Sequence, residues 1–553
     1  MLKDGQLYIA HSDNGNINLV GNMANRHGLI AGATGTGKTV TLQVLAETFS
    51  QAGVPCFMAD MKGDLSGISQ PGRLSGFIEK RMPEFGIENP QFAGCPTRFF
   101  DVFGEQGFPM RATVSAMGPQ LLARLMELTE VQAGVLNALF RIADDNNLLL
   151  IDLKDLKLML NFVGQNAAQF TTQYGNIAPA SVGAIQRAVL QIESEGGDKF
   201  FGEPAFDVED LFAVENGRGV MNVLAADKLM LNPKLYSTYL LWLMTELYAT
   251  LPEVGDLDLP KFVFFFDEAH MLFDGTSKAL VDKIEQVIRL IRSKGVGIYF
   301  ITQVPSDVPV NVLAQLSNRV QHALRAYTPQ DQKAVRAAAQ TFRANPAFKT
   351  EDAILDLGTG EALVSFLDEK GAPSVVERAK ILFPLSQIGA ITPGQRYDIQ
   401  AAAPQKLKDY EKFFDRESAY EMLTEAAQKA EEEAEKERKA LEKQKEKELK
   451  EKEKEKKSKS SSKKSGVGRT ILGTMIAAAA TSFARSAGTR IAKNIGGKST
   501  KSSTAKKSTS TKKSTTTKKS SSTLGTAAKK ATKTAVNTAA RKVTTEILKS
   551  IFS

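Results

Sequence analysis

The chain has few cysteines and no long apolar run, and each shortage excludes a class of protein. Its 553 residues include two cysteines, Cys56 and Cys95. Two thiols cannot form the disulfide framework of a secreted scaffold, so a reducing compartment is expected. No stretch reaches the roughly 18 apolar residues of a membrane-spanning helix, and the first residues lack the apolar core of a signal peptide. A soluble, cytoplasmic protein with a large core is therefore predicted.

Acidic residues are almost missing from the last part of the chain. Residues 461–553 hold 20 lysines and arginines but one acidic residue, a net charge of +19. Residues 1–404 carry −10 and residues 405–460 carry 0, so the overall charge of +9 comes from a basic tail. Such a tail attracts the phosphates of nucleic acids or an anionic membrane surface, or only keeps the chain in solution. Because few aromatic residues accompany the lysines, base stacking is not expected.

The most informative stretch is a glycine-rich sequence between an apolar run and a helical pattern. Residues 27–31 predict a buried strand, and the apolar positions from Val40 to Phe49 predict a helix. Between them lies G-x-x-x-x-G-K-[ST], the P-loop pattern of nucleotide-binding proteins. Its residues are Gly32, Ala33, Thr34, Gly35, Thr36, Gly37, Lys38 and Thr39.

The residue types in this loop fit phosphate binding. Glycines let the backbone turn tightly and point its N–H groups at phosphate oxygens, and the N-terminus of the following helix adds further N–H groups. Lys38 is predicted to reach the β- and γ-phosphates, and Thr39 to offer its hydroxyl to Mg²⁺. The sequence therefore predicts a site for ATP and Mg²⁺.

Two later strand ends complete a predicted hydrolytic site. Residues 262–266 form a continuous apolar run that ends in Asp267 and Glu268. Asp267 is predicted to hold Mg²⁺, directly or through water, and Glu268 to activate the attacking water as general base. Gln303 follows the next predicted strand, residues 296–301, where its amide can orient the water or sense the γ-phosphate. The structural alternatives are acidic residues that cap the next segment and an amide bonded to backbone.

Arginines near such a site can stabilise the charge that develops during phosphoryl transfer. The candidates are Arg26, Arg289, Arg292, Arg319 and Arg325, which precede, follow or flank predicted strands. Each is also explained as an ordinary surface arginine. His270 lies just after the acidic pair, but no Cys/His cluster surrounds it, so a metal site there is not expected.

The order of the predicted elements indicates an α/β fold. Strands alternate with helices from residue 27 to about 404, which implies a mainly parallel sheet wrapped by helices. A short N-terminal segment, residues 1–26, precedes this domain, and the last strand is expected at 361–366. Apolar residues at helical spacing predict a helical insertion at about 119–248.

The C-terminal part has a different composition. Residues 405–457 are dense in Glu, Lys and Ala, which predicts a long charged helix or coiled coil. Residues 458–553 form a basic tail rich in Lys, Ser, Thr and Ala, expected to be largely disordered. Amphipathic helices are predicted within it at 466–497 and 524–552.

Several of these stretches together resemble the HerA/FtsK class of P-loop motor ATPases, and more closely the bacterial HerA-like helicase C-terminal-domain family. The resemblance covers roughly residues 5–400. Besides the P-loop, it is carried by Asp60-Met61-Lys62-Gly63-Asp64 and by residues 262–270, 289–297, 301–303 and 318–326.

The resemblance implies a RecA-like fold, Mg²⁺-dependent ATP hydrolysis and a homo-oligomeric ring, usually a hexamer, that acts on DNA as a translocase or helicase. In such rings an arginine just before the P-loop strand reaches the neighbouring subunit's nucleotide, and Arg26 has this position. Arg292 matches a second arginine of the site, and Gln303 matches the polar sensor. Two other functions stay open: an ATPase that moves protein, and an ATP-gated scaffold whose C-terminal helices recruit partners. Glu268 beside Asp267 favours hydrolysis over the scaffold.

Overall fold

The computed structural model describes residues 1–459 except 4, 256 and 275–277. The chain divides into two compact units, Met1–Glu425 and Ala426–Ser553. In the second unit the structure describes the greater part of α16 (Ala419–Lys459). The charged segment is therefore helical, but α15 (Gln405–Asp409) is a separate short helix, and the long helix begins at Ala419 rather than near residue 405. The elements predicted in the basic tail lie outside the described residues.

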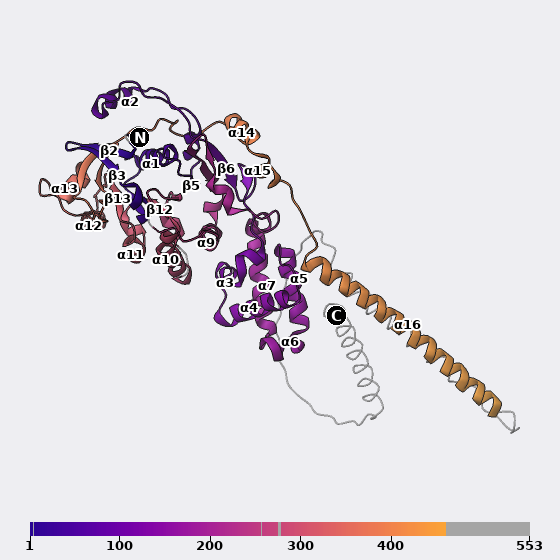
Figure 1. The fold of residues 1–553 in the computed structure, drawn as a ribbon. Coiled ribbons are helices and arrows are strands. Elements are labelled where there is room, and N and C mark those ends of the chain that lie inside the picture. Colours follow the sequence, from indigo (N-terminus) through magenta and orange to yellow (C-terminus); the bar gives the residue numbers. More distant parts are fainter. Residues whose placement is uncertain (4, 256, 275–277, 460–553) are drawn as a thin grey trace, which may run out of the picture. The chain divides into compact units, whose positions relative to one another are not determined.

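The first unit is built on one mixed sheet in which the central strands are parallel (Figure 1). The parallel strands lie in the order β13, β4, β12, β11, β5, β10, β6 and β7. Their bounds are Asn318–Gln321, Gly28–Ala31, Val296–Thr302, Phe262–Phe266, Cys56–Asp60, Met221–Ala225, Thr97–Asp101 and Phe108–Pro109. The predicted α/β fold with a mainly parallel, RecA-like sheet is confirmed.

Antiparallel strands extend this sheet beyond β13. They are β14 (Glu361–Ser365), β15 (Glu377–Ile381), β2 (Gln6–Ser12), β1 (Leu2–Lys3) and β3 (Gly15–Leu19). Because β2 pairs with β15, the N-terminal segment is part of the main sheet rather than a separate piece. The expectation that the strand at 361–366 is the last was wrong, since β15 follows it. Charged residues alternate with apolar ones in β15, and Arg378 is held by Asp356 at 2.9 Å and Glu361 at 2.8 Å.

Strand β10 lies inside the range predicted to be a helical insertion, and the sequence analysis missed it. Asn222 interrupts its apolar run, although the side chain is fully buried. The Asn222 Nδ2 group donates to the carbonyl oxygens of Cys56 at 3.0 Å and Leu211 at 2.9 Å, so the burial of this amino group is compensated. Partners this distant in the chain cannot be foreseen from local pattern.

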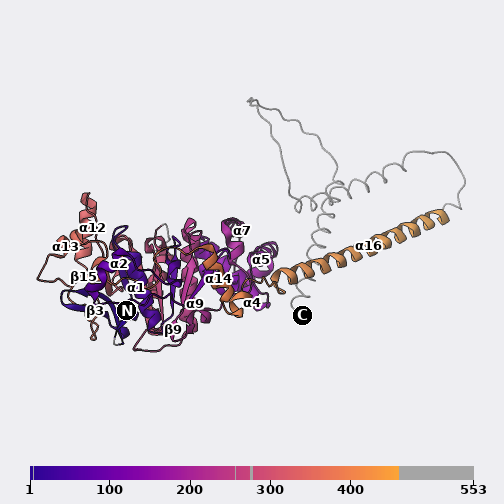
Figure 2. The ribbon, with the colours of Figure 1, turned by 90° about the horizontal axis from the view of Figure 1, so that it is seen from above.

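The helices of that range gather at one end of the sheet. Figures 1 and 2 show α4, α5 and α7 beyond the β6 side, far from α12 and α13 at the other end of the unit. The helices of the two groups are α3 (Val114–Leu125), α4 (Glu130–Asp145), α5 (Leu153–Gln165), α6 (Ala167–Tyr174), α7 (Pro179–Ile192) and α8 (Asp198–Phe200), and then α12 (Pro329–Ala339) and α13 (Thr350–Asp356). Thr129 and Asp152 start α4 and α5 with capping boxes.

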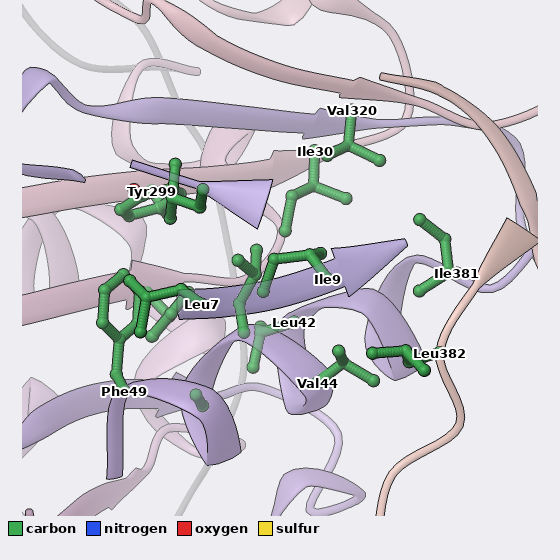
Figure 3. Close-up of a cluster of buried hydrophobic side chains, with 14 of the residues drawn as sticks. Leu7, Ile9, Ile30, Leu42, Val44, Phe49, Tyr299, Val320, Ile381 and Leu382 are labelled. Atoms are coloured by element: carbon green, nitrogen blue, oxygen red, sulfur yellow. The ribbon is translucent and has the colours of Figure 1, made fainter. Parts of the chain in front are cut away.

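Helix α1 (Lys38–Gln51) covers one face of the central strands, and α9 (Pro233–Thr250) and α10 (Lys278–Ile291) lie on the other side in Figure 1. Figure 3 shows apolar side chains of α1, β2, β4 and β12 meeting in one cluster. In it the ring of Phe49 lies 6.0 Å from that of Tyr299 and 6.3 Å from that of Phe265. Each large side chain buried in this way contributes about 1.5–3 kcal/mol, so α1 is held firmly against the sheet.

The remaining helices are α2 (Gly76–Arg81), α11 (Val310–Leu313) and α14 (Pro393–Ala402), and β8 (Val214–Glu215) pairs with β9 (Arg218–Gly219) in a small hairpin. Among residues 1–459, apart from the gaps named above, none of the helices is long and apolar enough to cross a membrane. Cys56 and Cys95 are buried free thiols, in accordance with the absence of a disulfide framework.

Candidate active site

The predicted P-loop joins the end of β4 to the start of α1. Gly37 stands at the N-cap of α1 with φ at 114°, a conformation that residues with a side chain rarely adopt. Backbone hydrogen bonds tie the loop to its surroundings: Gly32 N donates to Gln303 O (3.1 Å), Ala33 N to Ala323 O (2.8 Å), and Gly360 N to Thr36 O (3.0 Å). The loop is thus held open in front of the helix N-terminus, where an anion binds favourably.

Lys38 lies over this loop. Its Nζ donates to the carbonyl oxygens of Gly32 at 2.6 Å and Ala33 at 3.2 Å. Burial lowers the pKa of Lys38, whereas the charges of Glu268 and Asp267 act in the opposite direction. Two neutral carbonyls are weak partners for an ammonium group compared with phosphate oxygens, so a bound polyphosphate can displace them.

The acidic pair follows β11 directly. Asp267 is 5% exposed, and burial, together with the charge of Glu268, raises its pKa to about 6. A buried carboxylate of this kind at a phosphate site is stabilised by a divalent cation, and oxygen is the ligand type that Mg²⁺ prefers. Asp267 and the Thr39 hydroxyl, half-buried in the first turn of α1, therefore fit the predicted Mg²⁺.

Glu268 has an unusual backbone. Its φ and ψ are 48° and 50°, a left-handed conformation that is rare outside glycine and frequent at functional sites. Burial tends to raise the pKa of its carboxyl group, but the hydrogen bond and charge of Lys62 outweigh burial and lower it. Glu268 is thus ionised, as a general base must be before it accepts a proton.

Lys62 is a member of the site to which the sequence analysis gave no role. It lies in the turn after β5, and its Nζ is 2.6 Å from Glu268 Oε1. The only signal was the charged stretch 60–64 at a strand end, because the carboxyl edge of a parallel sheet is where such folds bind ligands. Nothing local in the sequence shows which carboxylate the lysine meets.

Strand order brings these groups together. β4, β12, β11 and β5 are neighbours in that order, so the residues that follow them lie along one edge of the sheet. Gln303 therefore stands between the P-loop and the acidic pair, with its side chain exposed. Lys38, Thr39, Gln303, Asp267 and Glu268, which sequence reasoning grouped from separate motifs, meet at this edge.

Arg26 and Arg292 lie at the opposite edge. Arg26 precedes β4 and Arg292 precedes β12, whereas the P-loop and Gln303 follow these strands. The seven residues of β12 span roughly 20 Å, beyond the reach of an arginine side chain. Neither arginine can therefore contact a nucleotide in the P-loop of its own chain.

His27 is a buried residue at the same edge of the sheet as these two arginines. Its ring accepts from Ile298 N at 3.0 Å and lies 2.9 Å from Ile288 O, so it connects β4, β12 and α10. Burial lowers its pKa to about 4, and the charges of Arg292 and Arg26 act in the same direction. The charges of both arginines thus act on one buried, neutral ring.

The other candidate arginines have structural partners. The guanidinium group of Arg319 donates to three backbone carbonyls, those of Leu316 (2.9 Å), Thr341 (2.6 Å) and Leu313 (3.2 Å). Arg289 pairs with Glu285 at 2.7 Å within α10. The exposed Arg325 follows β13, on the P-loop side of the sheet.

His322, also missed, supports the P-loop from behind. It is fully buried, with Nδ1 2.9 Å from Glu361 O and Nε2 2.8 Å from the Thr41 hydroxyl. A Cβ atom on Gly32 would come within 2.5 Å of the His322 Cβ, so the glycine is needed for this contact. A single histidine near an apolar strand gives no sign of such a role in the sequence.

The buried ring predicts a pH dependence of stability. Burial lowers the pKa of His322 to about 4, against 6.5 in an unfolded chain. As the pH falls below 6.5, the unfolded state binds a proton at this ring and the folded state does not. The contribution of the neutral ring to the free energy of unfolding is therefore complete above pH 6.5 and is lost toward pH 4. At pH 5 the free energy of unfolding is lower by about 2 kcal/mol for this reason. The difference in free energy of unfolding between wild type and His322→Gln, from urea titrations, should narrow by that amount between pH 7.5 and 5. An equal difference at both pH values would contradict this account.

One family of known proteins matches most of the chain. The sequence profile of the family described as helicase HerA-like C-terminal matches residues 6–502. The match continues past the core into the C-terminal part, beyond the residues that carried the resemblance in the sequence analysis. No curated protein matches the chain.

Among solved structures, the chain is similar to the bacterial conjugative coupling protein TrwB in its unbound form, at 16% identity and a TM-score of 0.43, over 67% of this chain and 87% of that chain. It is also similar to VirB4 of Thermoanaerobacter pseudethanolicus, at 14% identity and a TM-score of 0.46, over 71% and 99% of the two chains. Since the family profile covers most of the sequence, the protein belongs to the helicase HerA-like C-terminal family of P-loop ATPases.

Proposed function

We propose that the protein hydrolyses ATP as a ring-forming motor and that DNA is the substrate it moves. One observation supports assembly into a ring: the P-loop lies at one edge of the sheet, and Arg26 and Arg292 lie at the other. A site that needs these arginines is complete only when a second subunit brings its amino-terminal edge to the first subunit's P-loop. A closed ring repeats this contact at every interface, and a hexamer is the expected size.

In this mechanism the chain's own residues have separate tasks. The loop N–H groups and Lys38 hold the β- and γ-phosphates, and Gln303 orients the attacking water. Glu268 accepts the water's proton, and an arginine from the neighbouring subunit stabilises the charge on the transferred phosphoryl group. Thr39 and Asp267 would hold Mg²⁺, which neutralises phosphate charge.

Substitution of Glu268 separates binding from hydrolysis. Glu268→Gln removes the proton acceptor but keeps the shape of the side chain, so ATP should bind while kcat falls at least 100-fold. Lys38→Ala removes a phosphate contact and should weaken binding as well. Steady-state hydrolysis and binding of a fluorescent ATP analogue measure the two effects. Normal turnover by Glu268→Gln would refute the role of this glutamate.

The shared site predicts complementation between two inactive variants. Arg26→Ala keeps an intact P-loop and Lys38→Ala keeps an intact Arg26, so a mixed ring contains interfaces with both groups. Mixing the variants at several ratios should restore part of the ATPase activity. Arg289→Ala is the control, because this arginine pairs with Glu285 of its own helix and should stay close to wild type. Absence of recovery at every ratio would contradict action of Arg26 between subunits.

The choice of DNA as substrate rests on family membership and on the basic tail. We expect ATP hydrolysis to be stimulated by duplex or single-stranded DNA at low salt, because each lysine–phosphate contact releases counterions. The full chain is compared with a chain that ends at Lys459, which keeps the first unit whole and lacks the basic tail. Stimulation that survives truncation supports a translocase whose ring contacts DNA, whereas stimulation lost with the tail makes the tail the tether.

A protein-moving ATPase, with a protein partner for the C-terminal helices, is the second candidate, since conjugative coupling proteins are among the similar structures. It predicts intact basal hydrolysis without stimulation by DNA in either chain. Tight ATP binding with negligible turnover would instead favour an ATP-gated scaffold and would contradict a motor of either kind.

A further inference from the structure

The ion pair between Lys62 and Glu268 is the closest contact between charged side chains in the site. Lys62 Nζ lies 2.6 Å from Glu268 Oε1, and the Glu268 side chain is 11% exposed. The two residues follow β5 and β11, which pair in parallel from Val263 and Cys56 onward. The contact therefore depends on the register of two adjacent strands and not on a flexible surface encounter.

The two oxygens of the Glu268 carboxylate differ. Oε1 accepts the hydrogen bond from Lys62. Oε2 is buried and has no hydrogen-bond partner in the described part of the chain, although His270 Nδ1 stands 3.5 Å away. A buried oxygen without a partner is costly and is retained where it has a function. One oxygen is thus held by Lys62, and the other is enclosed beside His270, so the carboxylate is restrained on both sides.

The backbone of Lys62 is fixed independently of its side chain. Asp60 Oδ1 accepts hydrogen bonds from Lys62 N at 3.3 Å and Gly63 N at 2.7 Å, which closes the turn after β5. The Lys62 side chain is 54% exposed and contributes little to the core. Replacing it should therefore leave the turn and the fold intact.

We infer that Lys62 is a positioning residue for ATP hydrolysis, which holds the Glu268 carboxylate in one orientation at the end of β11. The inference rests on the proposed role of Glu268 as general base. Without the ion pair the carboxyl group can rotate about its terminal bond, and the geometry needed for proton transfer is populated less often. Lys62 acts through Glu268 and does not itself bind phosphate.

The test is the kinetics of Lys62→Met in the full-length chain. We expect kcat to fall about 10- to 100-fold with KM for ATP within about threefold of wild type, which is the pattern of an interaction used in the transition state. Lys62→Arg, which can keep one N–H on Oε1, should recover most of the loss. Lys157→Met is the matched control, because it removes another 2.6 Å ion pair, with Glu193, from the helical region.

Other results would overturn the inference. A normal kcat in Lys62→Met would mean that the ion pair has no kinetic role, and a raised kcat would make it a restraint. A raised KM with unchanged kcat, together with weaker binding of a non-hydrolysable ATP analogue, would make Lys62 a phosphate ligand. If Lys62→Met unfolds, the same measurements apply to Lys62→Gln. Failure of the proposed function itself is seen separately, as absent hydrolysis in wild type or normal hydrolysis in Glu268→Gln.

Discussion

Parallel pairing of four adjacent strands is the constraint on which the candidate site depends. In a parallel sheet every strand ends at the same edge, so β4, β12, β11 and β5 deliver the P-loop, Gln303, the acidic pair and Lys62 to one line. The strands are buried on both faces, with Phe265 toward α1 and Phe266 toward Phe300 on the other side. Displacing any one of them would separate groups that must stay within hydrogen-bond distance.

The same pairing separates the two candidate arginines from the P-loop of their own chain. Residues that precede a strand cannot reach those that follow its neighbour, and Arg26 and Arg292 precede β4 and β12. The ring of His27 bonds to the backbone of β12 and α10, and the charges of both arginines lower its pKa. Strand β12 therefore carries Gln303 at one end and lies beside this charged edge at the other. In the ring that we propose, such a strand would connect successive sites.

Charge within the site is closely balanced. Two lysines, Lys38 and Lys62, face the two carboxyl groups of Asp267 and Glu268, and each affects the protonation of the others. Lys38 donates hydrogen bonds to loop carbonyls that phosphate oxygens can replace. Lys62 forms an ion pair with the Glu268 carboxylate, which the proposed mechanism requires. The ion pair with Lys62 thus fixes the carboxylate to which we assign the role of general base.

The sequence by itself determined the P-loop, the acidic pair, Gln303 and the α/β class. Each of these is specified by a contiguous stretch of residues, either a motif or a repeating apolar pattern. Arg26 and Arg292 were singled out from five candidate arginines by the resemblance to HerA/FtsK ATPases. Tertiary structure alone decided the rest. β10 and β15 are short strands that contain Asn222 and Arg378, polar residues whose donor groups are paired elsewhere in the chain. The contacts of Lys62 and His322 depend on which strands become neighbours, and strand order is a property of the whole sheet.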